Sequence, residues 1–235
     1  MKCAVLSDLG LVRSRNEDNY LVDERRGLLV VCDGMGGCKG GDVASATAIE
    51  IISKYLPPTN AELNLELLNE SILEANRSIY DQSTGNVDLQ GMGTTVTAVV
   101  LKDRKLLVAH IGDSVLFIIS NNNIKKITQD HTLAEQMILE NVLTAGEAAT
   151  SPYNHVLTRA LGIEKQVYID NYEEYLHKGD ILLLCSDGLT HLLGQDDILT
   201  IVRKERSLDK AVEALVQLAL DRGGIDNVTV IVASI

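Results

Sequence analysis

The sequence predicts an α+β fold in which antiparallel sheets are covered by helices. Apolar runs of strand length fill the middle of the chain and recur near both ends, and segments with helical spacing come in pairs before and after the central strands. Consecutive strands of this kind form antiparallel meanders, and amphipathic helices cover their faces. Because no linker-like segment and no internal repeat interrupts the pattern, we expect one domain over residues 1–235.

The first part of the chain is expected to form three strands and then two helices. The strands are residues 2–8, 19–23 and 27–34. The third is a continuous apolar run, which is typical of a strand buried on both faces. Helical spacing begins at residue 40 and ends at the Pro57–Pro58 pair. It resumes over 62–80, where the leucines and isoleucines share one face, and a glycine-containing loop at 83–93 follows.

The central part of the chain is expected to be almost entirely β. Its strands are residues 94–101, 105–114, 115–120 and 124–128. Asp103-Arg104 and the asparagines at 121–123 are turn residues, which indicates hairpin connections between these strands.

The last part of the chain alternates between helices and strands. Residues 132–150 show an irregular helical pattern that Ser151-Pro152 closes. The remaining elements are expected as strands at 167–175, 180–188 and 226–235 and as helices near 195–204 and 208–221. The second of these helices has Leu208, Val212 and Leu215 on one face, which favours packing against a sheet.

Composition excludes several classes of protein. An apolar share of 46% rules out a disordered chain, and no apolar run approaches the roughly 20 residues of a membrane span. Residues 1–10 lack the apolar stretch of a secretory signal. A net charge of −12 argues against nucleic acid as a partner, because phosphate backbones require a basic surface. Cys3, Cys32, Cys38 and Cys185 have no CxxC spacing, and a reducing cytoplasm is the simplest compartment.

Aspartates stand at the ends of the predicted strands. They are Asp18, Asp33, Asp113, Asp187 and Asp226. Carboxylates that converge at a sheet edge without basic partners repel one another and are costly to bury. A hard divalent cation removes this cost, and oxygen-only sites select magnesium, manganese or calcium, whereas zinc prefers His and Cys. The pattern therefore predicts a two-metal site that activates water, although each aspartate taken alone is more simply a turn residue.

Two further segments accompany these aspartates. Arg13 offers a planar fork to phosphate oxygens, but an exposed arginine alone is more often part of a surface ion pair. Glycine at position 34 would let its backbone carbonyl approach a metal beside Asp33. The glycines that follow lack the Lys-Ser or Lys-Thr ending of a P-loop, so we do not expect ATP there.

Eight short motifs follow one another along nearly the whole chain. They are RSRNED (13–18), VVCDGMGG (30–37), GMGTTVTAVV (91–100), AHIGDS (109–114), TQDHT (128–132), LTRALG (157–162), LLCSDGL (183–189) and DNVTVIV (226–232). In type and order they resemble the metal-dependent protein phosphatases of type 2C, the PPM family. The DGMGG form and the compact length resemble its bacterial branch.

The resemblance implies a four-layer α-β-β-α sandwich of two packed antiparallel sheets flanked by helix pairs. It implies a serine/threonine protein phosphatase, in which a hydroxide bridging two metal ions hydrolyses phosphoserine and phosphothreonine in proteins. The cofactors would be two to three divalent ions, manganese or magnesium. A cognate Ser/Thr kinase would supply the substrates and is itself an expected partner.

The same resemblance assigns roles to individual residues. Asp33 would bridge both metals, and Asp187 and Asp226 would complete one site. The Gly34 carbonyl and, directly or through water, Asp18 would serve the other. Asp113 matches the ligand of a third, looser metal in bacterial members. Arg13 matches the phosphate-binding arginine, and residues 137–152 match a mobile flap beside the site.

The chain departs from the family pattern at several positions. Val115 replaces a common arginine, whose role we expect to be structural. Met35 stands where animal and plant members carry a histidine proposed as general acid, and Cys38 where many bacterial members carry histidine. The general acid is therefore unassigned, with a metal-bound water as the first expectation. Asn141 replaces a common glycine of the flap, so flap motion is expected to differ.

The histidines and the competing functions complete the expectations. His110 is expected in the core. The histidines expected at the surface or in loops are His155, His177 and His191, and the sequence indicates no role for His131. The competing functions are an inactive member that binds phosphoproteins or a kinase, and a hydrolase of small phosphate esters. The presence of the principal metal aspartates favours the active enzyme.

Overall fold

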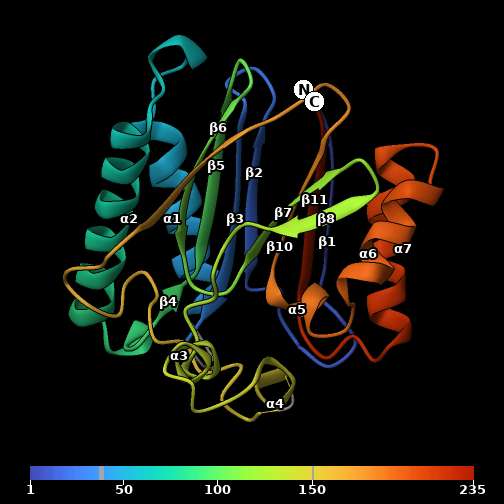
Figure 1. The fold of residues 1–235 in the computed structure, drawn as a ribbon. Coiled ribbons are helices and arrows are strands. Elements are labelled where there is room, and N and C mark those ends of the chain that lie inside the picture. The colour runs from blue at the N-terminus through green and yellow to red at the C-terminus, as the bar shows by residue number, and fades with distance from the viewer. Residues whose placement is uncertain (37–39, 150) are drawn as a thin grey trace.

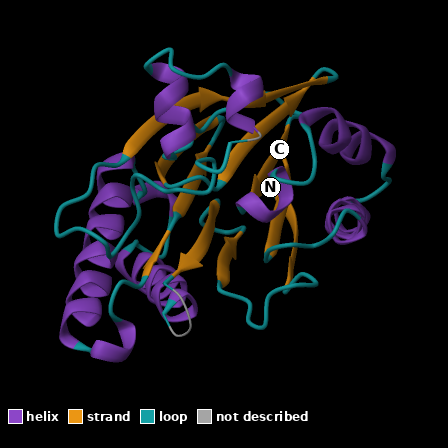
Figure 2. Ribbon diagram, turned by 90° about the horizontal axis from the view of Figure 1, so that it is seen from below, coloured by secondary structure: helices purple, strands orange, loops and turns teal. Residues whose placement is uncertain are grey.

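Two antiparallel sheets face each other, and each carries a pair of helices on its outer side (Figure 1). The computed structural model describes residues 1–36, 40–149 and 151–235. The termini lie together because β1 and β11 are neighbours, with Lys2 opposite Ser234. Seen from the end of the strands in Figure 2, the helix pairs lie on opposite sides of the two sheets.

The first sheet has five strands in the order β1-β11-β10-β7-β8. Their bounds are Lys2–Asp8, Val228–Ser234, Ile181–Cys185, Val115–Ser120 and Asn123–Lys126. Helices α6 (Gln195–Lys204) and α7 (Leu208–Asp221) cover its outer face through an apolar cluster that includes Leu183, Leu215 and Val230.

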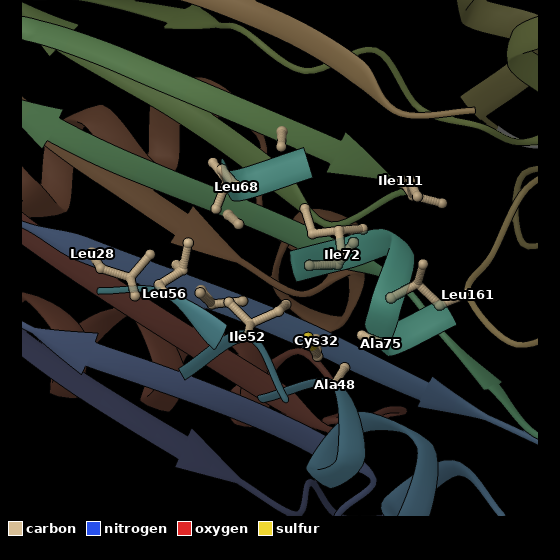
Figure 3. Close-up of a cluster of buried hydrophobic side chains, with 14 of the residues drawn as sticks. Leu28, Cys32, Ala48, Ile52, Leu56, Leu68, Ile72, Ala75, Ile111 and Leu161 are labelled. Atoms are coloured by element: carbon tan, nitrogen blue, oxygen red, sulfur yellow. The ribbon is translucent and has the colours of Figure 1, made fainter. Parts of the chain in front are cut away.

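The second sheet has the order β2-β3-β5-β6-β9, with the short β4 paired to the end of β3. The bounds are Asp18–Asp23, Leu28–Met35, Val96–Lys102, Lys105–Ile111, Asp170–Tyr175 and, for β4, Gly93–Thr94. Helices α1 (Gly41–Tyr55) and α2 (Leu65–Gly85) cover its outer face. Figure 3 shows this layer, with Leu28 and Cys32 of β3 facing Ile52 of α1 and Ile72 of α2.

Strand β3 shows how the sequence builds these layers. Leu28, Val30 and Cys32 belong to the cluster under α1 and α2, whereas Leu29 and Val31 belong to the cluster between the sheets. Side chains alternate between the two faces of a strand, so a run that is apolar at every position is buried on both faces. The inter-sheet cluster takes Leu182, Leu184 and Ile231 from the opposite sheet and joins both halves of the chain.

Three shorter helices lie at the end of the strands where the aspartates are found. They are α3 (Leu133–Leu139), α4 (Ala145–Ala149) and α5 (Asp187–Thr190). Thr132 caps α3 by accepting a hydrogen bond from the Glu135 amide, which satisfies a free donor of its first turn. Residue 150, which belongs to the expected flap of 137–152, lies outside the described part of the chain.

The predicted fold class and the four layers are confirmed, and the differences concern element ends. Helix α2 starts at Leu65, where the Asn64 side chain caps it, and runs on to Gly85, within the segment expected as a loop. The predicted helix over 132–150 divides where Asn141 adopts a positive φ of 58°. Strand β9 begins only at Asp170 and β11 only at Val228. Over the described residues, none of the helices has the length and apolar character required to cross a bilayer.

Candidate metal centre

All of the predicted site residues except Asp18 line one open pocket of about 990 Å³ at the end of the sheets. Its lining includes Asp33, Asp113, Asp187 and Asp226 together with Gly34 and Arg13. Asp33 belongs to β3, Asp113 follows β6, Asp187 follows β10 and Asp226 precedes β11. Both sheets therefore contribute carboxylates to one place, as their positions at strand ends predict.

Asp33 is held through its backbone by two threonines of the neighbouring segment. Its amide donates to Thr95 Oγ1 at 2.9 Å, and its carbonyl oxygen accepts from the Thr95 amide and from Thr94 Oγ1. These bonds leave the carboxylate available to the pocket, whose wall Asp33 lines.

Asp18 lies behind the pocket and does not line it. It stands directly opposite Asp33 in the β2–β3 ladder and is only 6% exposed. The hydroxyls of Ser186 and Thr229 both donate to its Oδ2 at 2.7 Å, while its Oδ1 is buried without a hydrogen-bond partner. Asp18 thus has one oxygen fixed by the opposite sheet and one unsatisfied.

Gly34 is required by a close approach of three backbone segments. A Cβ atom there would lie 2.2 Å from the Gly41 carbonyl oxygen and 2.5 Å from that of Glu17. The Gly34 amide also donates to the Glu17 carbonyl oxygen at 3.2 Å. Only glycine leaves room for the backbone to pass this close to the start of β2.

Asn227 fixes the N-terminal loop against the start of β11. Its Nδ2 donates to the carbonyl oxygens of Leu9 and Arg15, and its Oδ1 accepts from the Glu17 amide, each at 2.8 or 2.9 Å. This one side chain sets the path of the loop that carries Arg13 beside Asp226. No role for Asn227 was expected from the sequence.

Arg13 reaches into the pocket through an ion pair with Asp226. Its Nη2 lies 2.8 Å from Asp226 Oδ2, and half of its side chain, 51%, is exposed. The sequence allowed a surface ion pair or a phosphate-binding residue, and the geometry of Arg13 is compatible with both. Arg13 forms an exposed ion pair with Asp226, and it also lines the pocket.

The buried carboxylates carry a strong electrostatic cost. Burial raises the pKa of Asp33 well above its usual value, and the charges of Asp18 and Asp187 raise it further. Burial also raises the pKa of Asp113, with Asp187 again adding to it. The pKa of Asp18 is raised to about 7, mainly by burial, although the two hydroxyls that donate to it act in the opposite direction.

The donor set fits divalent cations that prefer oxygen. Asp187 Oδ1, like Asp18 Oδ1, is buried without a hydrogen-bond partner. Carboxylates crowded at low dielectric and left with unsatisfied oxygens are stabilised when a cation binds between them. Aspartate oxygens and a backbone carbonyl suit magnesium and manganese better than zinc.

A histidine that the sequence left unexplained supports the segment before Asp113. His131 Nδ1 accepts a hydrogen bond from the Gly112 amide at 2.9 Å, and its Nε2 lies 3.1 Å from Asp170 Oδ2. Nδ1 is thus the acceptor and Nε2 carries the proton, so the neutral ring ties the backbone beside Asp113 to β9. No sequence signal reveals this contact, because the two turns face each other only in the fold.

The remaining expectations divide among core, pocket and undescribed residues. His110 is buried, as expected, and Val115 is buried as well. Met35 lines the pocket, whereas Cys38 lies outside the described residues. His191 lies in the turn directly after α5, as expected for a loop residue, but its side chain is only 18% exposed and packs against the ring of His155. Neither the spacing nor the composition around these two histidines shows that the fold pairs them.

The chain matches a family model described as Protein phosphatase 2C over residues 12–225. It is 34% identical over 232 residues to the serine/threonine phosphatase stp of Listeria welshimeri, covering 96% of this chain and 92% of that protein. The crystal structure of the Mycobacterium tuberculosis serine/threonine phosphatase PstP/Ppp superimposes with a TM-score of 0.93 at 34% identity, covering 100% of this chain and 98% of the other. The catalytic domain of the phosphatase PstP in complex with two manganese ions is similar with a TM-score of 0.90 at 34% identity, covering 99% and 97%.

Proposed function

Because this chain belongs to the protein phosphatase 2C family and is a serine/threonine protein phosphatase, we propose that its aspartate pocket holds the metal ions with which it hydrolyses phosphoserine and phosphothreonine in proteins. The observation that carries the proposal is the convergence of Asp33, Asp113, Asp187 and Asp226 on one pocket. The similar PstP catalytic domain, whose crystal structure is a complex with two manganese ions, supports manganese or magnesium as the cofactor.

Each carboxylate has a distinct place in the proposal. Asp33 would serve both principal ions, because it lines the pocket with Asp187 and Asp226 and stands opposite Asp18 in the β2–β3 ladder. Asp187 and Asp226 hold one ion, and the Gly34 carbonyl with Asp18 serves the other. Asp113 holds a third, looser ion. When bound, such ions offset the charge of the phosphoryl group and activate water for attack.

Arg13 is proposed to bind the phosphate of the substrate. The guanidinium already lies at the pocket wall, and its exposed half leaves N–H donors free to face a phosphoryl oxygen. The Asp226 carboxylate orients it by a 2.8 Å contact, while Asn227 fixes the loop from which it projects. Arg13 thus orients the phosphate, and the aspartates position the ions.

We further propose that residues 1–235 form one catalytic domain with a flap at about 137–152. The inter-sheet cluster, which takes residues from both halves of the chain, supports one domain. Helices α3 and α4 beside the pocket support the flap. A cognate Ser/Thr kinase is proposed as the source of the substrates and as a partner. A reducing cytoplasm is proposed as the compartment, supported by free thiols at Cys3, Cys32 and Cys185.

Replacing Asp33 tests the metal site. Asp33→Asn keeps the shape of the side chain but removes the charge shared by both ions, so phosphopeptide hydrolysis with saturating Mn²⁺ should fall more than about a hundredfold, or about 2.7 kcal/mol. Mn²⁺ binding followed by calorimetry should weaken in parallel. The control is Asp209→Asn, an exposed aspartate in the first turn of α7. Retention of most of the activity and of the Mn²⁺ affinity in Asp33→Asn would contradict the proposed role.

A further inference from the structure

Two histidines and one aspartate meet at the margin of the carboxylate pocket, which His155 and Asp187 also line. One potential ligand atom from each of His155, Asp187 and His191 lies within 4.8 Å of the other two. His191 Nδ1 is 3.4 Å from Asp187 Oδ2, and the rings of His155 and His191 pack edge to face with centroids 4.2 Å apart. We propose that these three residues bind a transition-metal ion, with Zn²⁺ the best match to their chemistry.

The local fold brings the three ligands together from two separate segments. Asp187 and His191 are one helical turn apart across α5, so both side chains project from the same face. His155 comes from the segment after α4, where its neighbour Val156 is hydrogen bonded to both Leu133 and Tyr153. The backbone of α5 and that of the segment around His155 are therefore held in place by the fold before an ion binds.

The ligand set differs in kind from the adjacent pocket. Two imidazoles and one carboxylate favour zinc and similar ions, whereas the aspartates and the Gly34 carbonyl of the proposed catalytic site are oxygen ligands that favour magnesium or manganese. In a tetrahedral zinc site the ligand atoms are about 3.3 Å apart. The His191–Asp187 distance of 3.4 Å already has this value, and rotation of the exposed His155 side chain closes the remainder. Because His155 is exposed, a fourth position stays open to solvent.

The shared aspartate gives the proposed site a consequence for catalysis. Asp187 Oδ2 faces His191, and Asp187 is also the residue to which the proposed function assigns one catalytic ion. A zinc ion held by both histidines draws this carboxylate away from the catalytic ion and connects α5 to the segment that follows α4. We therefore expect zinc to inhibit the enzyme. This consequence depends on the proposed function, whereas zinc binding does not.

Direct titration tests the binding site without reference to activity. Protein saturated with Mg²⁺ is titrated with Zn²⁺ by calorimetry, and with Co²⁺ by visible absorption, which reports nitrogen ligation in a tetrahedral field. The wild-type protein should bind one additional Zn²⁺, and His155→Asn and His191→Asn should each weaken it by at least about tenfold. The matched control is His177→Asn, an exposed histidine outside the cluster. Thermal unfolding of each variant verifies its fold.

The possible results separate the site from the proposed function. Unchanged Zn²⁺ affinity and an unchanged Co²⁺ spectrum in the double variant His155→Asn/His191→Asn would overturn the site. Zinc inhibition of phosphopeptide hydrolysis, normalised to each variant's own activity without zinc, should require at least about tenfold more zinc in both single variants. Equal inhibition in all variants would overturn the competition for Asp187. Failure of Mg²⁺ or Mn²⁺ to support any hydrolysis would instead contradict the proposed function and leave the zinc titration valid.

Discussion

Arg13 is the residue for which a phosphate contact and a surface ion pair predict different results. Substitution by alanine should lower kcat/KM by about 10- to 100-fold, because a charge-assisted, bidentate phosphate contact contributes about 1.5–3 kcal/mol. Arg13→Lys should recover only part of this loss, since an ammonium cannot form the planar fork. The control is Arg203→Ala at the exposed end of α6. If kcat/KM for a phosphopeptide is the same in Arg13→Ala and the control, Arg13 is only a surface partner of Asp226.

The buried residue His110 should make the stability of the protein depend on pH, and the sign of this dependence can be worked out. Burial, together with a smaller contribution from the neighbouring His131, lowers the pKa of His110 to about 3. Its Nε2 faces the Gln129 carbonyl oxygen at 3.0 Å, so the neutral ring carries its proton there. Between pH 3 and the unfolded value of about 6.5, the unfolded chain binds a proton that the folded chain does not, so stability falls as pH decreases.

The measurement compares denaturant unfolding of wild type and His110→Gln at pH 7 and pH 5. The wild type should lose about 2 kcal/mol more than the variant between these pH values. His177→Asn is the control, because this histidine is exposed in the folded protein. Parallel losses in wild type and His110→Gln would show that His110 does not cause the acid sensitivity.

Site residues could be predicted where they belong to a short local motif. They could not be predicted where their role depends on a partner that is distant in the sequence. The five strand-end aspartates could be found because each stands within a short motif of its own strand. Ser186 and Asn227 could not, since Ser186 binds Asp18 across 168 positions and Asn227 binds Arg15 across 212. Neither pairing leaves a periodic pattern in the chain. The contact of His155 with His191 was missed for the same reason.

At the scale of elements, the end of α3 shows how a departure from the family pattern is accommodated. Asn141 has a φ of 58°, its amide donates to the Ile138 carbonyl oxygen, and the Val142 amide donates to that of Met137. These two bonds form a Schellman motif, which needs a left-handed residue where glycine is usual and asparagine is tolerated. The backbone therefore ends the helix as a glycine would, and the expected change in flap motion stays a prediction.

Substitutions at this position test the motif. Asn141→Gly should leave the end of α3 nearly unchanged, whereas Asn141→Val should destabilise it by about 1–2 kcal/mol, because a β-branched residue is strained in the left-handed region. Hydrogen exchange of the amides at 141 and 142 reports this local opening. Equal protection in the Gly and Val variants would show that the positive φ does not limit the stability of this segment.

Element types could be predicted more reliably than element ends. Alternation and helical spacing identified β3, α1 and α7 because each buries a regular apolar face. The ends of α2 and β9 depend on a cap at Asn64 and on the edge pairing of β9 with β6. The cap at Asn64 is a local signal that could have been recognised in the sequence, whereas the pairing of β9 with β6 exists only once the sheet has formed.

At the scale of the whole molecule, the cluster between the sheets determines whether the chain unfolds as one unit. Leu29 lies in this cluster and its neighbour Leu28 lies under α1 and α2, and both are fully buried. Each Leu→Ala change should cost about 2–5 kcal/mol through lost burial and the cavity left behind. If the chain is one domain, Leu28→Ala should destabilise the opposite helix-covered sheet by the same amount, although Leu28 belongs to the cluster under α1 and α2.

Hydrogen exchange at increasing denaturant tests this coupling with peptides from α1 and α7. Leu29→Ala and Leu28→Ala should shift both peptides to the same lower midpoint, because the inter-sheet cluster transmits the loss across the molecule. Leu73→Ala is the matched control, since Leu73 is 44% exposed on α2 and loses little burial. A shift of the α1 peptide alone in Leu28→Ala would mean that the two helix-covered sheets unfold separately. In that case the aspartate pocket, which draws Asp33 from one sheet and Asp187 from the other, would open before the rest of the fold is lost.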